Sequence, residues 1–353
     1  MNLFPKHIML NGAKDLVDEF IQIEHTTELE KELAGFLKEW ISPEDFIEVI
    51  TSGSTGTPKT FRLKKEFVAE SAQRTLHSFQ LKKNDRILHC LPIKYIAGKL
   101  MVVRALLGEL DLHLVEPSTD FAFLKMERFR FAAMVPNQVA KILKAESQPG
   151  ELLENIEKLL IGGSAIPASL EQTLQQFSTL CFSSYGMTET ATHIALRKIN
   201  GAGSDDWYHC LEDINVNLSA EGCLQIFMPG LEKPPLQTTD LAELKDEKTF
   251  RILGRSDNVI ISGGIKFSPE QIEKKLEPFI SVPFLISSLP HDSLGQQLVL
   301  VVEGKDSAAG TKRLEEICRR ELEKFEQPRK IIFVSEIPKT ENGKANRKGL
   351  FIA

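Results

Sequence analysis

Thr51-Ser52-Gly53-Ser54-Thr55-Gly56-Thr57-Pro58-Lys59 combines hydroxyl groups, two glycines and a lysine in one short stretch. The apolar run Phe46–Ile50 before it predicts a buried strand, and the residues from about Lys65 onward predict a helix. Such a loop suits a polyanion, because glycines let backbone N–H groups point inward and the lysine adds positive charge. It approaches the P-loop pattern but has Pro58 where that pattern has glycine. We predict a phosphate-binding loop of another kind; the plainer interpretation is a surface turn.

The bulk composition is that of an ordinary globular enzyme. The chain has 353 residues, which is more than one average domain and suits two or three. Its hydrophobic fraction of 42% and charged fraction of 26% are typical values. The net charge of −6 argues against a general nucleic-acid binder, which would carry a basic field. We therefore expect small-molecule partners; an oligomeric state, monomer or homodimer, cannot be predicted.

Cysteine and histidine usage points away from a metal site or a disulfide framework. The five cysteines show no CxxC spacing, and no HxxxH pair occurs. Residues Met1–Leu10 lack the long apolar segment of a signal peptide. The aliphatic run Leu298–Val302 is far too short to cross a membrane. These features predict a cytoplasmic protein with reduced thiols and no membrane span.

The first half of the chain alternates short apolar runs with helical periodicity, which predicts an α/β fold. Such alternation gives a parallel sheet with helices on both faces, and ligands bind at the carboxyl ends of its strands. Residues 1–45 are expected to be helical, with a polar face. Three predicted strand ends carry chemistry-bearing residues: Thr51–Lys59, Gly162–Ser164 and Tyr185–Thr190. Further strands are expected at 86–91, 110–115, 133–135, 158–161 and 179–184, and helices at 97–107, 137–144 and 168–177.

The second half changes character twice. Between Trp207 and Ile252 the helical periodicity disappears, which predicts a β-rich subdomain. After 255–258 a small α+β unit is expected, with a hairpin turning at Gly263-Gly264 and a helix opened by a capping box at Ser268–Gln271. We therefore predict an N-terminal domain over residues 1–254, a hinge at 255–258 and a C-terminal domain over residues 259–353.

Three polar motifs could carry chemistry. In Tyr185–Glu189 the tyrosine offers a flat face for a base, while Thr188 and Glu189 suit phosphate and Mg²⁺. Asp240 could accept hydrogen bonds from two ribose hydroxyls, although an Asx-turn is the commoner use. Lys344 lies in a polar loop and could neutralise charge on a phosphate ester, although composition alone favours a solvated basic tail.

Taken together, these motifs resemble the acyl- and aryl-CoA synthetase family of adenylate-forming (ANL) enzymes. The resemblance rests on six motifs in the family's order, and it runs from about residue 46 to the end. It implies the ANL fold and a two-step reaction, in which a carboxylate attacks the α-phosphate of MgATP and the thiol of coenzyme A then displaces AMP. The six motifs are Thr51–Lys59, Tyr185–Glu189, Thr239-Asp240, Gly254–Asp257, Gly263–Glu270 and Pro338–Lys344.

The resemblance also implies a role for each matching residue. Lys344 would bridge the acyl carboxylate and the α-phosphate, which Thr188 contacts, and Glu189 would hold Mg²⁺. Asp257 would be the hinge about which the C-terminal domain rotates between half-reactions. The β- and γ-phosphates would lie at Thr51, Ser52, Gly53, Ser54, Thr55, Gly56 and Lys59. The adenosine would lie at Gly162, Gly163, Ser164, Ser184, Tyr185, Gly186, Asp240 and Arg255, and coenzyme A at Gly263, Gly264 and Lys266.

The sequence departs from the family pattern in three places. Only fifty residues precede the phosphate loop, so part of the usual N-terminal subdomain is expected to be missing or replaced. The usual Thr-Gly-Asp is Thr238-Thr239-Asp240 here. In Leu91–Gly98, the segment near the acyl pocket, Lys94 and Tyr95 stand where family members often have an aromatic residue or histidine.

The cations near the expected acyl pocket predict an acid with a second carboxylate. Lys94, His193 and Arg197 could each meet such a group. Within the family, the chain most resembles the o-succinylbenzoate–CoA ligases of menaquinone biosynthesis, whose substrate is an aromatic keto-diacid. Two alternatives stay open: an aryl- or amino-acid adenylation enzyme that loads a carrier protein, and a non-catalytic nucleotide-binding module.

Overall fold

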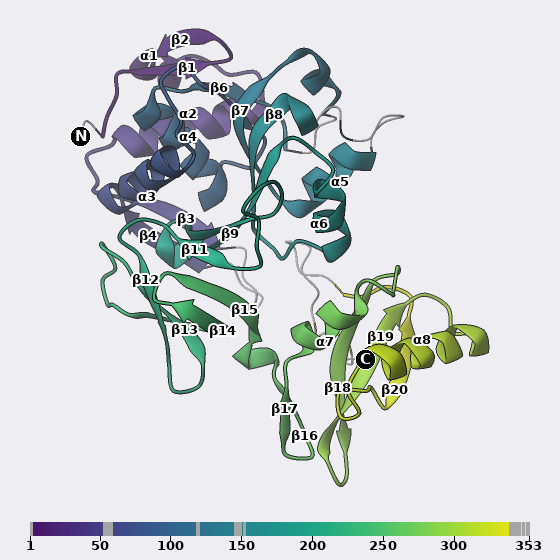
Figure 1. Cartoon of the computed structure of the whole chain (residues 1–353). Helices are drawn as coiled ribbons and strands as arrows, with labels where there is room; N and C mark the ends of the chain where they lie inside the picture. The colour runs from purple at the N-terminus through teal and green to yellow at the C-terminus, as the bar shows by residue number, and fades with distance from the viewer. Residues whose placement is uncertain are drawn as a thin grey trace. The chain divides into compact units, whose positions relative to one another are not determined.

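The computed structural model describes residues 3–51, 59–117, 121–144, 150, 153–338, 347 and 350, and Figure 1 labels its elements. The chain forms two compact units. The first contains Met1–Ile214 and Pro229–Glu232, and the second contains Asn215–Met228 and Lys233–Ala353. The predicted hinge at 255–258 concerns a movement between functional states and stays a prediction.

The first unit is built on a parallel sheet, as predicted. Its strands β9, β8, β7, β5 and β6 lie in that order, and each pairs with its neighbours in parallel. β10 and β11 extend one edge in antiparallel pairing. At the other edge β1 pairs with β6 in parallel, and β2 pairs with β1 antiparallel. The bounds are β1 (His7–Leu10), β2 (Ala13–Leu16), β5 (Arg86–His89), β6 (Asp111–Leu114), β7 (Phe129–Met134), β8 (Ile156–Ile161), β9 (Leu180–Gly186), β10 (His193–Lys198) and β11 (Tyr208–Cys210).

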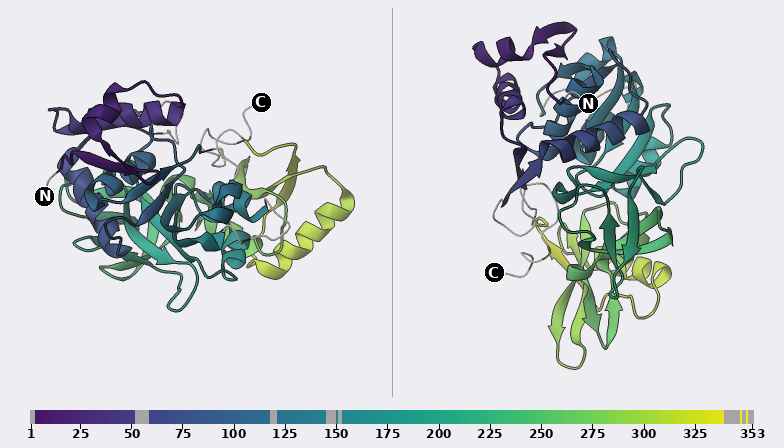
Figure 2. Two further views of the ribbon diagram at one scale, coloured as in Figure 1. Left: turned by 90° about the horizontal axis from the view of Figure 1, so that it is seen from above. Right: turned by 90° about the vertical axis from the view of Figure 1, so that its left-hand side faces the viewer.

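Helices cover both faces of this sheet because its strands are apolar on both sides. On one face, Met134 and Ile161 belong to a core cluster that includes residues of α5 and α6. On the other face, Phe79 at the end of α3 packs against Phe131 and Phe182, with ring centroids 4.8 and 5.2 Å apart. Figures 1 and 2 show the two helix layers with the sheet between them. The helices are α3 (Lys65–Ser78), α4 (Ile96–Gly108), α5 (Pro136–Lys144) and α6 (Ala168–Leu174), with 3-10 turns at Phe121–Met126 and Leu153–Asn155.

The prediction of an all-helical start was wrong for the first residues. β1 and β2 form a hairpin that turns at Asn11 and Gly12, with φ of 51° and 84°. Both values lie in the left-handed region that a type I′ turn requires, so this Asn-Gly pair was a hairpin signal in the sequence. The predicted helical segment is confirmed only beyond the hairpin, in α1 (Val17–Gln22) and α2 (Glu28–Ile41).

The strand before the phosphate loop does not belong to the parallel sheet, which corrects a second prediction. β3 (Phe46–Thr51) pairs antiparallel with β4 (Lys59–Lys64) in a sheet of two strands. The sequence showed β4 by the alternation of apolar Phe61 and Leu63 with polar neighbours, a period-two pattern. Residues 51–59 therefore connect two hairpin strands, and α3 begins at Lys65 as predicted.

The second unit contains most of the predicted β-rich segment and all of the predicted α+β segment. Strands β12 to β15 pair antiparallel in sequence order. The α+β segment buries an apolar cluster between its sheet and the helices α7 and α8. The bounds are β12 (Asn215–Leu218), β13 (Cys223–Phe227), β14 (Leu236–Asp246), β15 (Thr249–Arg255), β16 (Ile260–Ser262), β17 (Ile265–Phe267), α7 (Pro269–Leu276), β18 (Phe284–His291), β19 (Gly295–Glu303), α8 (Ala308–Glu321) and β20 (Lys330–Val334).

The capping box predicted at the start of α7 is not formed. Ser268 is the N-cap and Pro269 follows it, but the serine side chain caps no backbone N–H. Its hydroxyl instead lies 2.9 Å from the carbonyl oxygen of Leu253 and 3.1 Å from the carboxylate of Glu270. Gly254 permits this approach, because a Cβ there would lie 2.2 Å from the Ser268 hydroxyl.

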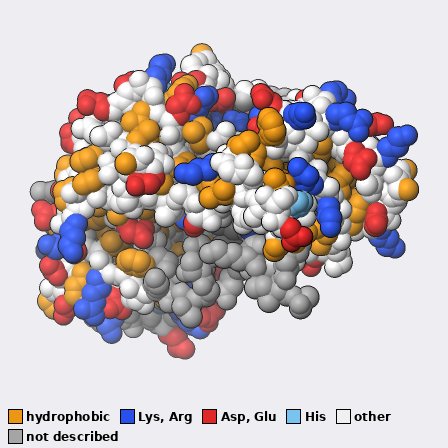
Figure 3. Space-filling model, turned by 90° about the horizontal axis from the view of Figure 1, so that it is seen from below, with side chains coloured by type: hydrophobic (Ala, Val, Ile, Leu, Met, Phe, Trp, Pro, Cys, Tyr) orange, Lys and Arg blue, Asp and Glu red, His pale blue; other side chains and the backbone are white. Residues whose placement is uncertain are grey.

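The surface carries no single-sign field on the face that Figure 3 displays, where acidic and basic side chains are interspersed. No helix in the described ranges is long and apolar enough to span a bilayer.

Candidate active site

The carboxyl ends of β8 and β9 lie side by side and bring two predicted adenosine segments together. Ile161 is in register with Ser183. The hydroxyl of Ser184 donates to the Ile161 carbonyl over 3.2 Å. A Cβ on Gly162 would lie 2.2 Å from that hydroxyl, so glycine is what lets the two strand ends approach. Gly163 follows with φ of 84° and, like Ser164, is exposed, so this edge presents backbone to solvent.

The Tyr185–Glu189 motif spans the end of β9 and the turn that follows it. Contacts with Thr190 and Thr192 hold it in place. A Cβ on Gly186 would lie 2.3 Å from the backbone oxygen of Thr192, so only glycine lets the end of β9 approach the start of β10 this closely. Buried Thr190 accepts from the Met187 N–H at 3.1 Å and fixes the 3-10 turn η3 (Thr188–Thr190). Thr188 is half-buried and Glu189 is exposed on that turn.

The aromatic part of the motif also has a fixed neighbour. The half-buried ring of Tyr185 lies 5.9 Å from the ring of Tyr208, whose hydroxyl shares a 2.8 Å hydrogen bond with Ser183. This contact fixes the position of the Tyr185 ring at the end of β9, where its flat face could receive a base.

A single carboxylate, Glu189, is available for magnesium at this turn. Within the ranges described, no group of three His, Cys, Asp or Glu side chains gathers into a metal site. This fits Mg²⁺ bound with a nucleotide, since Mg²⁺ is commonly held by one or two carboxylates, phosphate oxygens and waters. The donor set does not fit a metal held by protein alone.

The second unit brings the predicted ribose residues and the predicted hinge residue together. Asp240 on β14 pairs across the strands with Arg255 on β15, and an Arg255 nitrogen lies 3.4 Å from the carboxylate. Arg255 also bonds the carboxylate of Asp257, at 2.9 and 3.2 Å, on the 3-10 turn η4 (Ser256–Asn258). Thr239 accepts from the same guanidinium. Because Asp240 lies within a strand, the Asx-turn interpretation was wrong.

A buried cationic cluster lies in the first unit beside the Tyr185 motif. Arg104 on α4 is 2% exposed and donates to the Thr192 hydroxyl over 3.2 Å. That hydroxyl lies 3.3 Å from Nδ1 of His193, the first residue of β10. Arg104 also contacts the sulfur of Met101, at 3.5 Å. The cluster thus joins the helix after the acyl-pocket segment to the strand after the Tyr185 motif.

The cluster lacks a counter-charge. In the part of the chain that the structure describes, no carboxylate pairs with Arg104, and its Nε and the Nε2 of His193 have no hydrogen-bond partner. Burial lowers the pKa of Arg104 to about 9. Burial and the neighbouring Arg104 hold the pKa of His193 well below its ordinary value, so His193 is neutral at pH 7. An unpaired buried guanidinium is costly, and an anion from outside the protein would relieve that cost.

Arg104 was not among the residues predicted for the site, although the sequence contained a signal for it. The residue lies in a helix that is buried from Gly98 to Leu106, where the other charged residue, Lys99, is paired with Glu39. Arginine is almost never fully buried without a partner, so a lone arginine in such a helix indicates a site.

Two other predicted cations are less suited to a second carboxylate. Arg197 already forms a two-point ion pair with Glu171, so its charge is neutralised. Lys94 is exposed, with its ammonium 5.2 Å from the centre of the Tyr95 ring. It lines an open hollow of about 370 Å³ with residues of β3 and β4, including Ile50 and Thr60. Lys94 therefore lies next to the strands that flank the phosphate loop.

Several predicted residues lie outside what the structure describes. They are Ser52, Gly53, Ser54, Thr55 and Gly56 of the phosphate loop and the catalytic candidate Lys344. Thr51 and Lys59 are described in backbone only, as the paired ends of β3 and β4. The hairpin predicted to approach coenzyme A is described: Gly263 and Gly264 have φ of 59° and 84°, and Lys266 is exposed.

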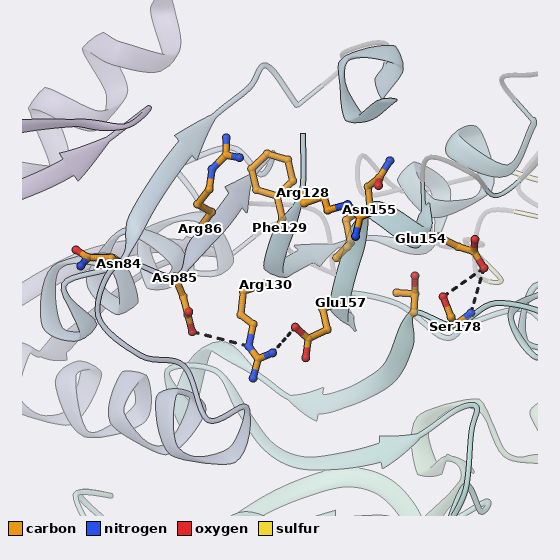
Figure 4. Close-up of a pocket in the computed structure, with 12 residues that line it drawn as sticks. Asn84, Asp85, Arg86, Arg128, Phe129, Arg130, Glu154, Asn155, Glu157 and Ser178 are labelled. Carbon is orange, nitrogen blue, oxygen red and sulfur yellow. Dashed lines mark hydrogen bonds and ion pairs between the residues drawn. The ribbon is translucent and has the colours of Figure 1, made fainter. Parts of the chain in front are cut away.

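Another hollow, of about 430 Å³, lies where β5, β7, β8 and β9 begin, the opposite end of the strands from the residues above. Figure 4 shows its charged lining, in which Arg130 joins Glu157 and Asp85. Its three arginines face three carboxylates, so the lining gives an anion little net attraction. Ligands of parallel sheets bind at the other strand end, and the candidate site is therefore placed there.

A second buried histidine gives a prediction for stability. Burial lowers the pKa of His89 from 6.5 to about 4, against an opposing backbone contact with Leu91. Between pH 6.5 and pH 4, His89 binds a proton in the unfolded chain but stays neutral in the folded chain. Acidification from pH 7 to pH 4 should therefore lower the free energy of unfolding by about 3 kcal/mol through His89. Urea unfolding at pH 7, 5.5 and 4 should show that His89→Leu loses less stability on acidification than the parent. Exposed His7→Gln is the control, and parallel pH curves for parent and His89→Leu would refute the assignment.

Comparison with known proteins gives the class of this site. The AMP-binding enzyme model matches residues 8–210, and the AMP-binding enzyme C-terminal domain model matches residues 286–344. The chain belongs to the AMP-binding enzyme family. It has the ANL adenylating-enzyme fold and is an AMP-forming acid–CoA ligase, so the alternative of a non-catalytic module was wrong.

Individual relatives and solved structures are similar to most of this chain. The 2-succinylbenzoate–CoA ligase of Listeria innocua is 25% identical over 93% of this chain and 74% of its own length. An acyl-CoA synthetase (AMP-forming)/AMP-acid ligase II-like protein from Dyadobacter fermentans is 32% identical, with a TM-score of 0.64, covering 94% of this chain and 96% of that one. The o-succinylbenzoate coenzyme A synthetase of Bacillus subtilis, solved with ATP and magnesium ion, has a TM-score of 0.72 at 21% identity, over 86% and 69% of the two chains.

Proposed function

We propose that this protein is an o-succinylbenzoate–CoA ligase that acts in the cytoplasm in menaquinone biosynthesis. It uses ATP with Mg²⁺ to form an acyl-adenylate and then transfers the acyl group to coenzyme A as a thioester. The names of the relatives support this substrate, and so does the buried cation found in this chain. The site itself would accept any aromatic or short aliphatic acid with a second carboxylate of the right reach.

The observation that carries the proposal is Arg104. Its guanidinium is 2% exposed and has no carboxylate partner in the described ranges. The desolvation cost of this buried charge is therefore not offset by an ion pair within the described protein. A substrate carboxylate would supply the missing charge and could accept two parallel N–H bonds from an arginine. A monocarboxylic acid would leave the guanidinium unpaired, so the cluster should reject it.

His193 supports Arg104 as a neutral neighbour. Because its pKa is held well below the ordinary value, it adds no second charge at neutral pH. Its Nε2 lacks a hydrogen-bond partner in the described ranges and could meet a carboxylate oxygen or a water beside it. The hydroxyl of Thr192 links the two side chains and fixes their spacing.

The proposed nucleotide roles rest on the family pattern, and the local geometry within each unit supports them. The Gly162–Ser164 edge and Tyr185 would hold adenine, with Ser184 and Gly186 shaping the slot. Asp240 would accept from the ribose hydroxyls, with its carboxylate oriented by Arg255 at 3.4 Å. Thr188 would contact the α-phosphate and Glu189 would hold Mg²⁺, which neutralises the triphosphate. The loop from Thr51 to Lys59 would bind the β- and γ-phosphates.

The two half-reactions would use two arrangements of the domains, 1–254 and 259–353, about the hinge at 255–258. Lys344 would serve adenylation, and the Gly263–Lys266 hairpin would serve thioester formation. Arg255 joins Asp240 to the hinge residue Asp257, so ribose binding and hinge position share one guanidinium. Such a rotation would let one active site be built twice from the same chain.

A ligation assay tests the substrate. The purified full chain is incubated with MgATP, coenzyme A and one acid at a time, and AMP and thioester are measured. We expect o-succinylbenzoate to exceed benzoate and medium-chain fatty acids by about 100-fold or more in kcat/KM, because the monoacids leave a buried charge unpaired. Turnover of benzoate or a fatty acid without turnover of o-succinylbenzoate would refute the proposal. Thioester formation on a carrier protein but not on free coenzyme A would favour the carrier-loading alternative.

A further inference from the structure

Arg347, three residues beyond Lys344, is anchored in the C-terminal part of the second unit. Its two terminal nitrogens each donate to one carboxylate oxygen of Glu273, both over 2.6 Å. One of them also donates to the carbonyl oxygen of Ile286, at 2.6 Å. Glu273 in turn accepts from the Ile286 N–H at 2.6 Å. The two charged side chains are each 19% exposed, and their ion pair ties the chain at Arg347 to α7 and β18.

The polar contacts of Arg347 extend through Glu270 toward the predicted hinge. A carboxylate oxygen of Glu270, one turn before Glu273 on α7, lies 3.8 Å from Arg347. The same carboxylate oxygen accepts from the side-chain amide of Asn258 at 2.6 Å. The other oxygen of Glu270 contacts Ser268, whose hydroxyl meets the Leu253 carbonyl. Arg347 thus belongs to one polar network with residues on both sides of Asp257.

The ion pair of Arg347 limits where Lys344 can lie, because only three peptide steps separate the two residues. Consecutive Cα atoms are about 3.8 Å apart, so three peptide steps hold the Cα of Lys344 within about 11 Å of the Cα of Arg347. Wherever the C-terminal part moves, Arg347 moves with α7 and brings this end of the segment with it. A two-point Arg–carboxylate pair sets direction as well as distance, which a lysine at the same place could not do.

We propose that Arg347 is a positioning residue for adenylation: its ion pair with Glu273 ties the chain, three residues after Lys344, to α7 and β18 of the C-terminal domain. The inference rests on the proposed function, because it assumes that Lys344 serves the first half-reaction. Arg347 does not touch the substrate in this account. It acts through Lys344, and its loss should therefore leave the second half-reaction largely unchanged.

The test compares the two half-reactions in four variants of the full chain: Arg347→Met, Arg347→Lys, Lys344→Ala, and Lys344→Ala with Arg347→Met. Adenylation is followed by ATP–pyrophosphate exchange, and thioester formation by adding coenzyme A to preformed acyl-adenylate. Arg347→Met should slow exchange by about 100-fold, the loss typical of a misplaced catalytic group, and change thioester formation by less than about threefold. Arg347→Lys should not restore exchange, because one ammonium cannot make the two-point pair.

The double variant separates positioning from a general loss of structure. If Arg347 acts only through Lys344, the double variant should be no slower in exchange than Lys344→Ala alone. Arg347→Met together with Glu273→Gln removes both charges, so it should keep the parent's thermal stability while exchange stays slow. Arg320→Met is the matched control, since Arg320 is an exposed arginine that pairs with Glu321 on the surface of α8.

Three results would overturn the inference. Equal loss of both half-reactions in Arg347→Met would mean that the domain is damaged as a whole. A further loss in the double variant would mean that Arg347 acts independently of Lys344. Undiminished exchange in Arg347→Met, with exchange lost in Lys344→Ala, would contradict the inference alone, whereas undiminished exchange in Lys344→Ala would contradict the proposed function first.

Discussion

Replacing Lys344 with alanine is expected to slow acyl-adenylate formation by about 10²- to 10³-fold, or on the order of 3–4 kcal/mol in the barrier. The reason is electrostatic, because an ammonium bridging the acyl carboxylate and the α-phosphate stabilises charge that develops only in the transition state. Thioester formation from preformed acyl-adenylate should stay within about threefold of the parent, since the lysine would have left the site by that step. Pyrophosphate exchange and single-turnover thioester formation measure the two steps separately.

The control for this experiment is Lys330→Ala, which removes an exposed lysine at the start of β20 in the same domain. It should change neither half-reaction. If Lys344→Ala slowed both half-reactions equally, the proposed rotation between two arrangements would be wrong. If it slowed neither, another group would have to supply the positive charge during adenylation.

Replacing Arg104 with methionine is expected to lower kcat/KM for o-succinylbenzoate by about 100-fold or more, because a buried charge pair between protein and substrate is lost. Activity with benzoate should change little, so the preference between the two acids should collapse. Stability of the ligand-free protein should not fall and should rise, since the substitution removes a buried charge that has no carboxylate partner in the described ranges. The panel assay and a thermal melt measure the two effects.

Lys94→Met tests the rival cation in the same way. Lys94 is exposed beside Tyr95, so its removal should change the preference between the two acids far less than removal of Arg104. A collapse of preference in Lys94→Met, with preference kept in Arg104→Met, would move the second carboxylate to the exposed hollow near β3 and β4. A large drop in the thermal stability of Arg104→Met would show that the arginine is a structural group.

Much of the fold could be predicted because periodicity and burial agree in the parallel sheet. In β7, Met134 faces the layer of α5 and α6 while Phe131 packs against Phe79 on the opposite face, and the strand and helix positions followed from that alternation. The wrong strand and helix predictions concern two hairpins, whose short sequence signals lie next to longer helical patterns. Asn11-Gly12 and the alternation around Phe61 both indicated hairpins, but each lies next to strong helical periodicity.

The site could be predicted only in part. A sequence motif indicates which chemical groups a site contains, but it does not show which side chains contact one another in the fold. The pairing of Asp240 with Arg255 follows from register between β14 and β15, which sequence does not give. The neutralisation of Arg197 by Glu171 joins residues far apart in the chain, and so does the contact of Arg104 with Thr192. Ser268 had the residues of a capping box, but the close approach of Leu253 gave its hydroxyl another partner.

The central claim is that the acid carries a second carboxylate and that Arg104 receives it. A crystal structure of the full chain with o-succinylbenzoate and a non-hydrolysable ATP analogue tests this most directly. The account predicts a carboxylate oxygen of the acid about 2.8 Å from the Arg104 guanidinium, with the other carboxyl group toward Thr188 and the α-phosphate. An acid whose second carboxylate lies at Lys94 or in solvent, with Arg104 still unpaired, would contradict it.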